Sequence, residues 1–339
     1  MRTLDEEIPS GVWNRTNCPH LQSGLIYWES ASTWSSTLGH IPTSSDKTIT
    51  LPSNKKVVLR NCSFSVITND VSHPYQQIVV PSGSELIFDD SDIELHVREI
   101  KISQGGKLSI GSESCRLFSN IKIVFHGNKS DSSVSNSDSS KTSKGILNSG
   151  GTVDIHGKQY HPTWTRLTYT IVPGDDLVYL QDQVNWEVGQ QIVVITSSWF
   201  DCPPEYEDDW CTPCYSWQSC DVAKQQNEVR TIVAIDNSTD GNFRILQVDS
   251  PFQYQHWASF EYQSEVVLLS RRIVVEGTDT GDNFGGHILI GGDTYGIGRI
   301  SGVLGYQMGQ LNILGRYPFH FHLIGKGDNA KASYFQDCA

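Results

Sequence analysis

The sequence lacks the long apolar runs and the helical periodicity that define many classes of protein. No stretch of about 18 consecutive apolar residues occurs in its 339 residues, so no membrane-spanning helix is expected within it. The opening MRTLDEEIPSG has no apolar run that could serve as a signal peptide. We therefore interpret the chain as a piece of a longer protein, with any leader or membrane anchor lying outside it.

Basic residues are also in short supply. The chain has 25 Lys and Arg against 38 Asp and Glu, and its formal net charge is -13. This balance argues against bulk attraction to nucleic acid or to anionic membranes. A polyanionic ligand would have to bind at a local site.

What the sequence does contain is typical of an oxidising compartment. Eight cysteines occur together with glycosylation acceptors of the Asn-X-Ser/Thr type. The acceptor asparagines are Asn14, Asn61, Asn128 and Asn237. We expect a secreted protein or a cell-surface ectodomain with disulfides.

Short runs rich in Val, Ile, Thr and aromatic residues recur between Gly, Asn, Asp and Ser turns, which predicts an all-β protein. After residue 270 the runs are separated by Gly-rich corners, a pattern that favours the stacked rungs of a right-handed parallel β-helix. The predicted strands include 48–51, 56–59, 77–80, 84–88, 107–110, 121–125, 152–155, 191–195, 229–235, 272–276, 287–290, 299–304 and 318–323.

The pattern changes after Arg271, where we expect the first β-helix rungs, 270–339. Before that point, residues 199–228 interrupt the strands, and we expect an insertion stapled by disulfides. Cys202, Cys211, Cys214 and Cys220 offer a four-thiolate zinc site as the alternative. The carboxylates of 201–209 offer Ca²⁺ ligands, but their spacing matches no defined calcium loop, and a solvated turn is the alternative.

Histidines give the most informative candidate site. Strand alternation in GRYPFHFHLIG places His320 and His322 on one face, opposite Phe319 and Phe321. His287 begins an earlier rung after its own glycine corner, so stacking predicts that the three imidazoles converge. Three neutral imidazoles suit a divalent metal such as Zn, Cu or Ni. The alternative is a stacked, solvated histidine surface.

Arginines and an aromatic ring adjoin this face. Arg316 and Tyr317 are its neighbours in the sequence, and Arg271 and Arg272 lie one or two rungs earlier. Guanidinium groups and a stacking ring are suited to an anionic sugar. Surface ion pairs are the alternative role for each arginine.

A catalytic pair is harder to identify. Asp154 and His156 alternate onto one strand face, where a carboxylate beside an imidazole is a candidate acid and base. A polar strand surface explains the same pattern. A glycosidase needs two carboxyl groups roughly 5–9 Å apart, and no motif in the sequence singles out such a pair.

Several of these segments resemble the eight-glycine (G-eight) domain family with parallel β-helix repeats, which includes fibrocystin and cell-surface hyaluronidases. The resembling segments are WESASTWSSTLGHIPTSSDKTITLPSNKKVVL, SGGTVDIHGKQYHPTWTRL, VNWEVGQQIVVITSSWF, FGGHILI and MGQLNILGRYPFHFHL. The last two are similar to the hyaluronidase branch. The layout after Leu167, which lacks that branch's large inserted domain, resembles fibrocystin. The resemblance implies four parts, namely an amino-terminal segment 1–24, an eight-glycine domain 25–167, a β-rich continuation 168–269 and the first β-helix rungs 270–339.

The resemblance leaves two functions open. The first is Ca²⁺-dependent depolymerisation or binding of hyaluronan or a similar extracellular glycan. The second is a non-catalytic adhesion or receptor ectodomain. Either would act on extracellular polysaccharide and not on nucleic acid, with membrane attachment only through an anchor outside this chain.

Overall fold

The computed structural model describes residues 17–60, 74–131, 144–197, 226–237, 244–292 and 295–339. It divides them into two units, one formed by residues up to 159 together with 271–339, and the other by 160–270. We call the first the coil unit and the second the inserted unit. No helix of the described residues is long and apolar enough to cross a membrane.

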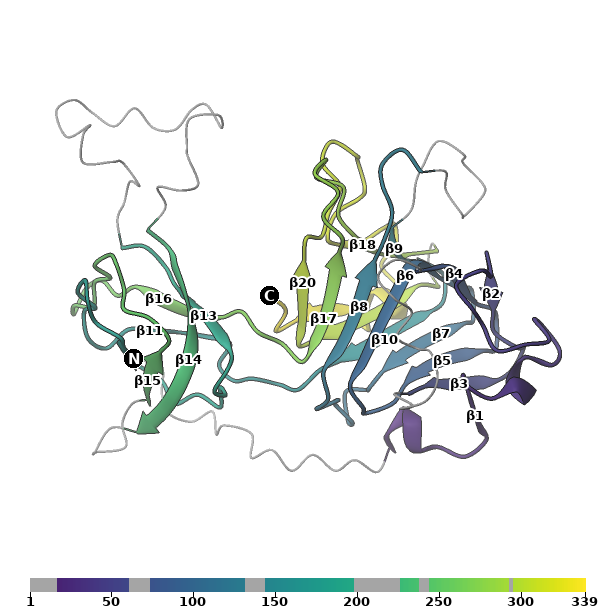
Figure 1. Ribbon diagram of the computed structural model, residues 1–339, viewed down its shortest axis with the longest axis horizontal. Coiled ribbons are helices and arrows are strands. Elements are labelled where there is room, and N and C mark those ends of the chain that lie inside the picture. The colour runs from purple at the N-terminus through teal and green to yellow at the C-terminus, as the bar shows by residue number, and fades with distance from the viewer. Residues whose placement is uncertain (1–16, 61–73, 132–143, 198–225, 238–243, 293–294) are drawn as a thin grey trace. The chain divides into compact units, whose positions relative to one another are not determined.

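The coil unit is built from parallel strands that stack as three sheet faces. Face A contains β1 (Leu25–Tyr27), β3 (Lys56–Leu59), β5 (Glu85–Phe88), β7 (Lys107–Ile110), β10 (Thr152–His156), β19 (Ile297–Ser301) and β22 (Tyr334–Gln336). The strands β3, β5, β7 and β10 of this face lie side by side in Figure 1.

The other two faces share one long strand, β6 (Ile93–Ser103). Its first half pairs with β8 and its second half pairs with β9. Face B contains β2 (Ile49–Thr50), β4 (Tyr75–Val80), the second half of β6, β9 (Gly145–Ser149), β18 (His287–Gly291) and β21 (Phe319–Phe321). Face C contains the first half of β6, β8 (Ile121–Phe125), β17 (Ile273–Gly277) and β20 (Val303–Tyr306).

Each full turn of the chain visits face C, then face B, then face A, and we call one such turn a coil. The turn β8, β9, β10 is followed by β17, β18, β19 and then by β20, β21, β22. Side chains of alternate residues point inward and form one apolar core. Ile123, Ile100 and Ile155 come from the three faces, and all are fully buried in this core.

The inserted unit is antiparallel. Its strands follow the order β11 (Trp164–Arg166), β16 (Glu265–Leu268), β13 (Gln191–Val194), β14 (Glu228–Asn237), β15 (Arg244–Val248) and β12 (Leu177–Leu180). A bridge between Leu167 and Leu180 joins the two ends of this order, so the sheet closes around its own core. The remaining elements of the described residues are the short helices η2 (Pro19–Leu21), η3 (Ala31–Trp34) and α1 (Asp328–Lys331).

The all-β prediction is confirmed, and the strands predicted at 56–59, 107–110 and 121–125 have the observed bounds. The structure differs in where the parallel coils begin. They were expected only from residue 270, but β1 to β10 pair in the same faces as β17 to β22. The reason is that the inserted unit interrupts a coil between β10 and β17, so the coil resumes about 110 residues later. The insertion predicted at 199–228 lies mostly outside the described residues.

One disulfide closes the first coils. Cys18 and Cys115 are bonded, 97 residues apart in sequence, and both are buried. Cys338 is not in a disulfide, and the other five cysteines lie outside the described residues.

We predict that the double substitution Cys18→Ala and Cys115→Ala lowers the free energy of unfolding by about 2–5 kcal/mol, because it releases a long closed loop in the unfolded chain. Urea denaturation without reductant measures the change, and Cys338→Ala is the control with a smaller loss. A double variant that unfolds at the wild-type urea concentration would contradict the prediction.

Candidate functional site

A cleft of about 960 Å³ lies in the coil unit where two loops follow strands of face C. One loop, residues 278–286, links β17 to β18, and the other, residues 307–318, links β20 to β21. Backbone hydrogen bonds from Gly285 to Gly309 and from Gly286 to Gln307 hold the loops together. A side chain at Gly285 would collide with the carbonyl oxygen of Gln307, which explains the glycine pair before His287. We call this hollow the corner cleft.

Arg316 lines the corner cleft and places a positive charge in its wall. Its Nη1 donates to Nε2 of His287 at 2.5 Å, and Nδ1 of His287 donates to the carbonyl oxygen of Lys144 at 3.0 Å. This pairing requires the neutral imidazole. Burial, together with the Arg316 charge, lowers the pKa of His287 to about 3. Arg316 is therefore held by a neutral acceptor.

No carboxylate of the described residues forms an ion pair with Arg316. Burial lowers the pKa of this guanidinium, whereas the nearby Glu99 raises it. An arginine nevertheless stays protonated at neutral pH. The corner cleft thus has a cation in its wall whose charge is not neutralised by direct contact.

Glu99 lies behind Arg316 in a row of polar side chains on the outside of face B. The register places Gln77 beside Glu99, Glu99 beside Gly145 and Gly145 beside His287. Gln77 Nε2 donates to Oε1 of the fully buried Glu99 at 2.7 Å, but Oε2 has no hydrogen-bond partner among the described residues. Burial raises the pKa of Glu99, against the lowering effects of Gln77 and nearby cations that include Arg316.

Lys144 fixes the loop that forms one wall of the corner cleft. Its buried Nζ donates to the carbonyl oxygens of Thr278 and Phe284 at 2.7 and 2.8 Å. Burial lowers the pKa of Lys144 to about 8. Neither Glu99 nor Lys144 was found from the sequence, because only the register between coils brings them to His287.

Tyr317, His320 and His322 form a row of rings beside the corner cleft. The centroids of Tyr317 and His320 are 4.9 Å apart, and those of His320 and His322 are 5.1 Å apart, both edge to face. His320 Nδ1 donates to the carbonyl oxygen of Gly315 at 2.8 Å. Tyr317 is 47% exposed and lines the cleft, so its ring is open to a ligand.

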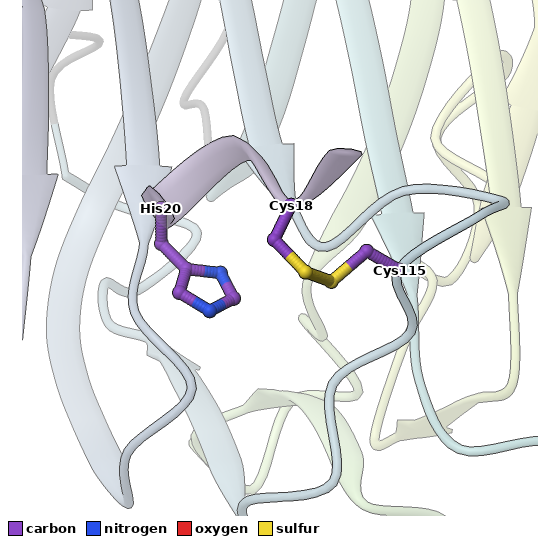
Figure 2. Close-up of side chains that lie close together, drawn as sticks. All are labelled: Cys18, His20 and Cys115. Atoms are coloured by element: carbon purple, nitrogen blue, oxygen red, sulfur yellow. A yellow bond between two sulfur atoms is a disulfide. The ribbon is translucent and has the colours of Figure 1, made fainter. Parts of the chain in front are cut away.

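The predicted metal triad of His287, His320 and His322 does not form a group of mutually close ligand atoms in the structure, since Nε2 of His287 is bonded to Arg316. The described residues hold one such three-residue group, Cys18, His20 and Cys115. Figure 2 shows that the two sulfur atoms of this group form the disulfide, so they are not thiolate ligands.

Arg271 and Arg272 do not line the corner cleft. They precede β17, whereas the cleft follows it. Arg271 is buried, and its Nε donates to the carbonyl oxygen of Asp337 at 2.7 Å. Arg272 donates to Oδ1 of Asn120 at 3.2 Å.

Asp154 and His156 point outward from face A, as their alternation predicts, but they do not bond to each other. Arg299 holds both carboxylate oxygens of Asp154, at 2.6 and 3.0 Å. His156 Nε2 lies 2.9 Å from the hydroxyl of Tyr334. Burial lowers the pKa of His156 to about 4, despite the opposing effect of Asp154. These contacts describe an interstrand polar ladder.

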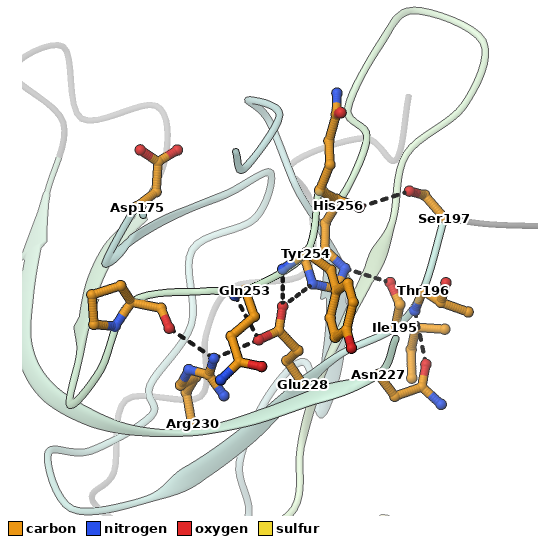
Figure 3. Close-up of polar contacts among 12 residues, drawn as sticks. Asp175, Ile195, Thr196, Ser197, Asn227, Glu228, Arg230, Gln253, Tyr254 and His256 are labelled. Carbon is orange, nitrogen blue, oxygen red and sulfur yellow. Dashed lines mark hydrogen bonds and ion pairs between the residues drawn. The ribbon is translucent and has the colours of Figure 1, made fainter. Parts of the chain in front are cut away.

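The inserted unit has a buried polar cluster of its own, drawn in Figure 3. Glu228 accepts from the backbone N–H groups of Gln253 and Tyr254, and it contacts Arg230 and His256 at 2.5 and 3.0 Å. Burial alone would raise the pKa of Glu228, but these donors lower it overall. Both carboxylate oxygens are occupied, which suits a structural role.

Comparison with known proteins agrees with this architecture. Residues 33–168 match the G8 domain, and residues 283–339 match the CEMIP beta-helix. The chain thus matches the models of both the G8 domain and the CEMIP beta-helix, and the resemblance found in its sequence is confirmed.

Three relatives illustrate the match. Protein rliB of Dictyostelium discoideum is 38% identical over 326 residues, covering 95% of this chain and 25% of the relative. A G8 domain-containing protein of the same organism is 40% identical over 325 residues, covering 96% and 20%. Human Fibrocystin-L is 28% identical over 319 residues, covering 80% and 7%. The chain spans a quarter or less of the length of these relatives.

We predict that His287→Ala lowers the free energy of unfolding by about 1–3 kcal/mol at pH 7.5, because Arg316 and the Lys144 carbonyl lose a buried partner. Urea denaturation measures the loss. His322→Ala, at an exposed position in the same ring row, should stay within about 0.5 kcal/mol of the wild type.

The contribution of His287 should also depend on pH. The imidazole is neutral in the folded chain, where its pKa is about 3, but titrates near 6.5 when unfolded. The unfolded state therefore binds more protons between these values, and stability falls as pH drops below 6.5. The advantage of the wild type over His287→Ala should be smaller at pH 5 than at pH 7.5. An advantage that is equal or larger at pH 5 would contradict the neutral assignment.

Proposed function

We propose that the corner cleft binds an anionic extracellular polysaccharide, with hyaluronan as the leading candidate. The observation that carries the proposal is Arg316, a cation that lines the cleft without a carboxylate partner among the described residues. A buried or half-buried charge is costly unless it is paired, so the site favours a ligand that supplies a carboxylate. The alternating glucuronate groups of hyaluronan meet this requirement.

Tyr317 gives the site a second element of sugar recognition. Its exposed ring offers an apolar face to the C–H groups of a pyranose. The neighbouring ring of His320 uses Nδ1 to bond the Gly315 carbonyl, which leaves Nε2 for a contact with the sugar. His320 and His322 would then contact the chain of sugars beyond the cleft. In this arrangement Arg316 selects for charge, and the ring row adds contact area.

One structural feature, a disulfide, supports an extracellular setting for this activity. The Cys18–Cys115 disulfide persists in oxidising compartments.

We further propose that the coils wind right-handed as a parallel β-helix, because parallel crossover connections are right-handed in about 98% of cases. Attachment to a membrane would need an anchor outside this chain.

Depolymerisation of the bound glycan is the catalytic form of the proposal. The buried Glu99, whose Oε2 lacks a hydrogen-bond partner among the described residues, and Asp279 of the cleft wall are carboxyl groups near the site. Ca²⁺ or a histidine-bound divalent ion remains a proposed cofactor of that activity. Similarity to Fibrocystin-L favours the second candidate, a non-catalytic adhesion or receptor ectodomain that binds glycan without cleaving it.

We predict that Arg316→Gln weakens binding of a hyaluronan oligosaccharide by about 10- to 150-fold, the value of one charge-assisted contact of 1.5–3 kcal/mol. Calorimetric titration measures the affinity. Arg272→Gln is the matched control, because Arg272 is a partly exposed arginine of the same unit that does not line the cleft. His320→Ala and His322→Ala should fold normally and bind more weakly. Equal affinity of wild type and Arg316→Gln would contradict the proposal.

Incubation with end-labelled hyaluronan separates the two candidate functions. If the protein is a depolymerase, the size of the glycan falls with time, and the reaction stops when a chelator removes Ca²⁺. If both this chain and the full-length protein bind the glycan without reducing its size, the enzymatic function is excluded and the adhesion function remains.

A further inference from the structure

A pair of histidines on face C, away from the corner cleft, has the geometry of a metal site. His96 lies in the first half of β6, and His126 directly follows β8 on the next coil. Nδ1 of His96 and Nε2 of His126 are 2.8 Å apart, and the ring centroids are 5.0 Å apart. The His96 side chain is buried and His126 is half-buried.

We propose that His96 and His126 together bind one divalent transition-metal ion of the zinc, copper or nickel class. Two imidazole ligands at Zn–N distances of 2.0–2.1 Å and a tetrahedral angle place their nitrogens about 3.3–3.4 Å apart. The observed separation of 2.8 Å is shorter by about half an ångström, which a small side-chain rotation supplies. Water would fill the remaining coordination positions.

Glu94 supplies the outer contact that metal-binding histidines usually have. One oxygen of its carboxylate lies 3.1 Å from Nε2 of His96, the nitrogen that does not face His126. Such a carboxylate fixes the imidazole as the Nε2–H tautomer and turns the lone pair of Nδ1 toward the metal position. Glu94 is therefore the orienting carboxylate, His96 is the ligand that it orients, and His126 is the second ligand.

The protonation states also fit. In the absence of metal, one proton lies between the two rings, and with Nε2–H of His96 directed to Glu94 it belongs to Nε2 of His126. Metal binding then needs His126 to change only its tautomer, with its proton moving to Nδ1 through solvent. Burial and the nearby His96 and Lys144 lower the pKa of His126 to about 4, so the ring is neutral at physiological pH.

This pair is better arranged for a metal than the rings of the corner cleft. Nε2 of His287 is occupied by Arg316, and the edge-to-face contact between His320 and His322 forms no hydrogen bond between their nitrogens. The proposal is independent of the glycan function, because none of its residues lines the corner cleft.

The test is a titration of the intact, chelator-treated chain with Zn²⁺ and, in parallel, with Ca²⁺, followed by calorimetry and by thermal unfolding. We expect one equivalent of Zn²⁺ to bind and to raise the unfolding temperature, with no such effect of Ca²⁺. His96→Gln and His126→Gln should each weaken Zn²⁺ binding at least tenfold. Glu94→Gln, which keeps both ligands, should weaken it about 10- to 100-fold.

Two controls locate the site. His40→Gln removes an imidazole that also bonds to a carboxylate, Asp46, but pairs with no second histidine in the part of the chain that the structure describes, so Zn²⁺ affinity should not change. The double variant His320→Ala and His322→Ala should also bind as the wild type does. Loss of binding only in that double variant would overturn the proposal, as would wild-type affinity in both His96→Gln and His126→Gln. Circular dichroism before titration verifies folding, and Glu94→Gln carries the test if a histidine variant unfolds.

Discussion

In-register pairing of parallel strands between coils is the constraint on which the whole coil unit depends. Each strand of faces A, B and C is bonded to the equivalent strand of the neighbouring coil, so a residue's neighbours are set by register and not by sequence distance. Asp154 meets Arg299 across 145 residues, and His287 lies beside Gly145. Because strands lie about 4.8 Å apart, polar side chains on the outer faces form continuous rows.

This constraint also explains how the chain accommodates an entire second unit. Residues 160–270 leave after β10 and the chain returns at β17, which pairs with β8 as if no residues intervened. The entropic cost of closing a loop grows only slowly with its length, so the inserted residues add little cost once they fold by themselves. The inserted unit has its own core and its own buried Glu228 cluster.

Alternation within a strand could be predicted from the sequence, whereas register between strands could not. The bounds of β3, β7 and β8 follow from local runs of apolar residues, and the outward directions of His320 and His322 follow from the inward Phe319 and Phe321. The row from Gln77 through Glu99 to His287 depends on the lengths of the connections between coils, for which the sequence gives no rule. The metal triad expected from the sequence also took no account of Arg316, whose guanidinium occupies Nε2 of His287. Arg271 and Arg272 were expected beside the histidine face, but they precede β17, whereas the corner cleft follows it.

The most direct test of this account is a disulfide cross-link between adjacent coils on face B. Leu289 and His320 are register partners whose side chains point outward, and neighbouring Cα atoms at about 4.8 Å are within bridging distance. The account predicts that the Leu289→Cys, His320→Cys chain forms this link under mild oxidation, as detected by peptide mass spectrometry. A Leu289→Cys, His322→Cys chain, about 8 Å apart by the same spacing, should not. Absence of the first link, or equal formation of both, would contradict in-register stacking of the coils.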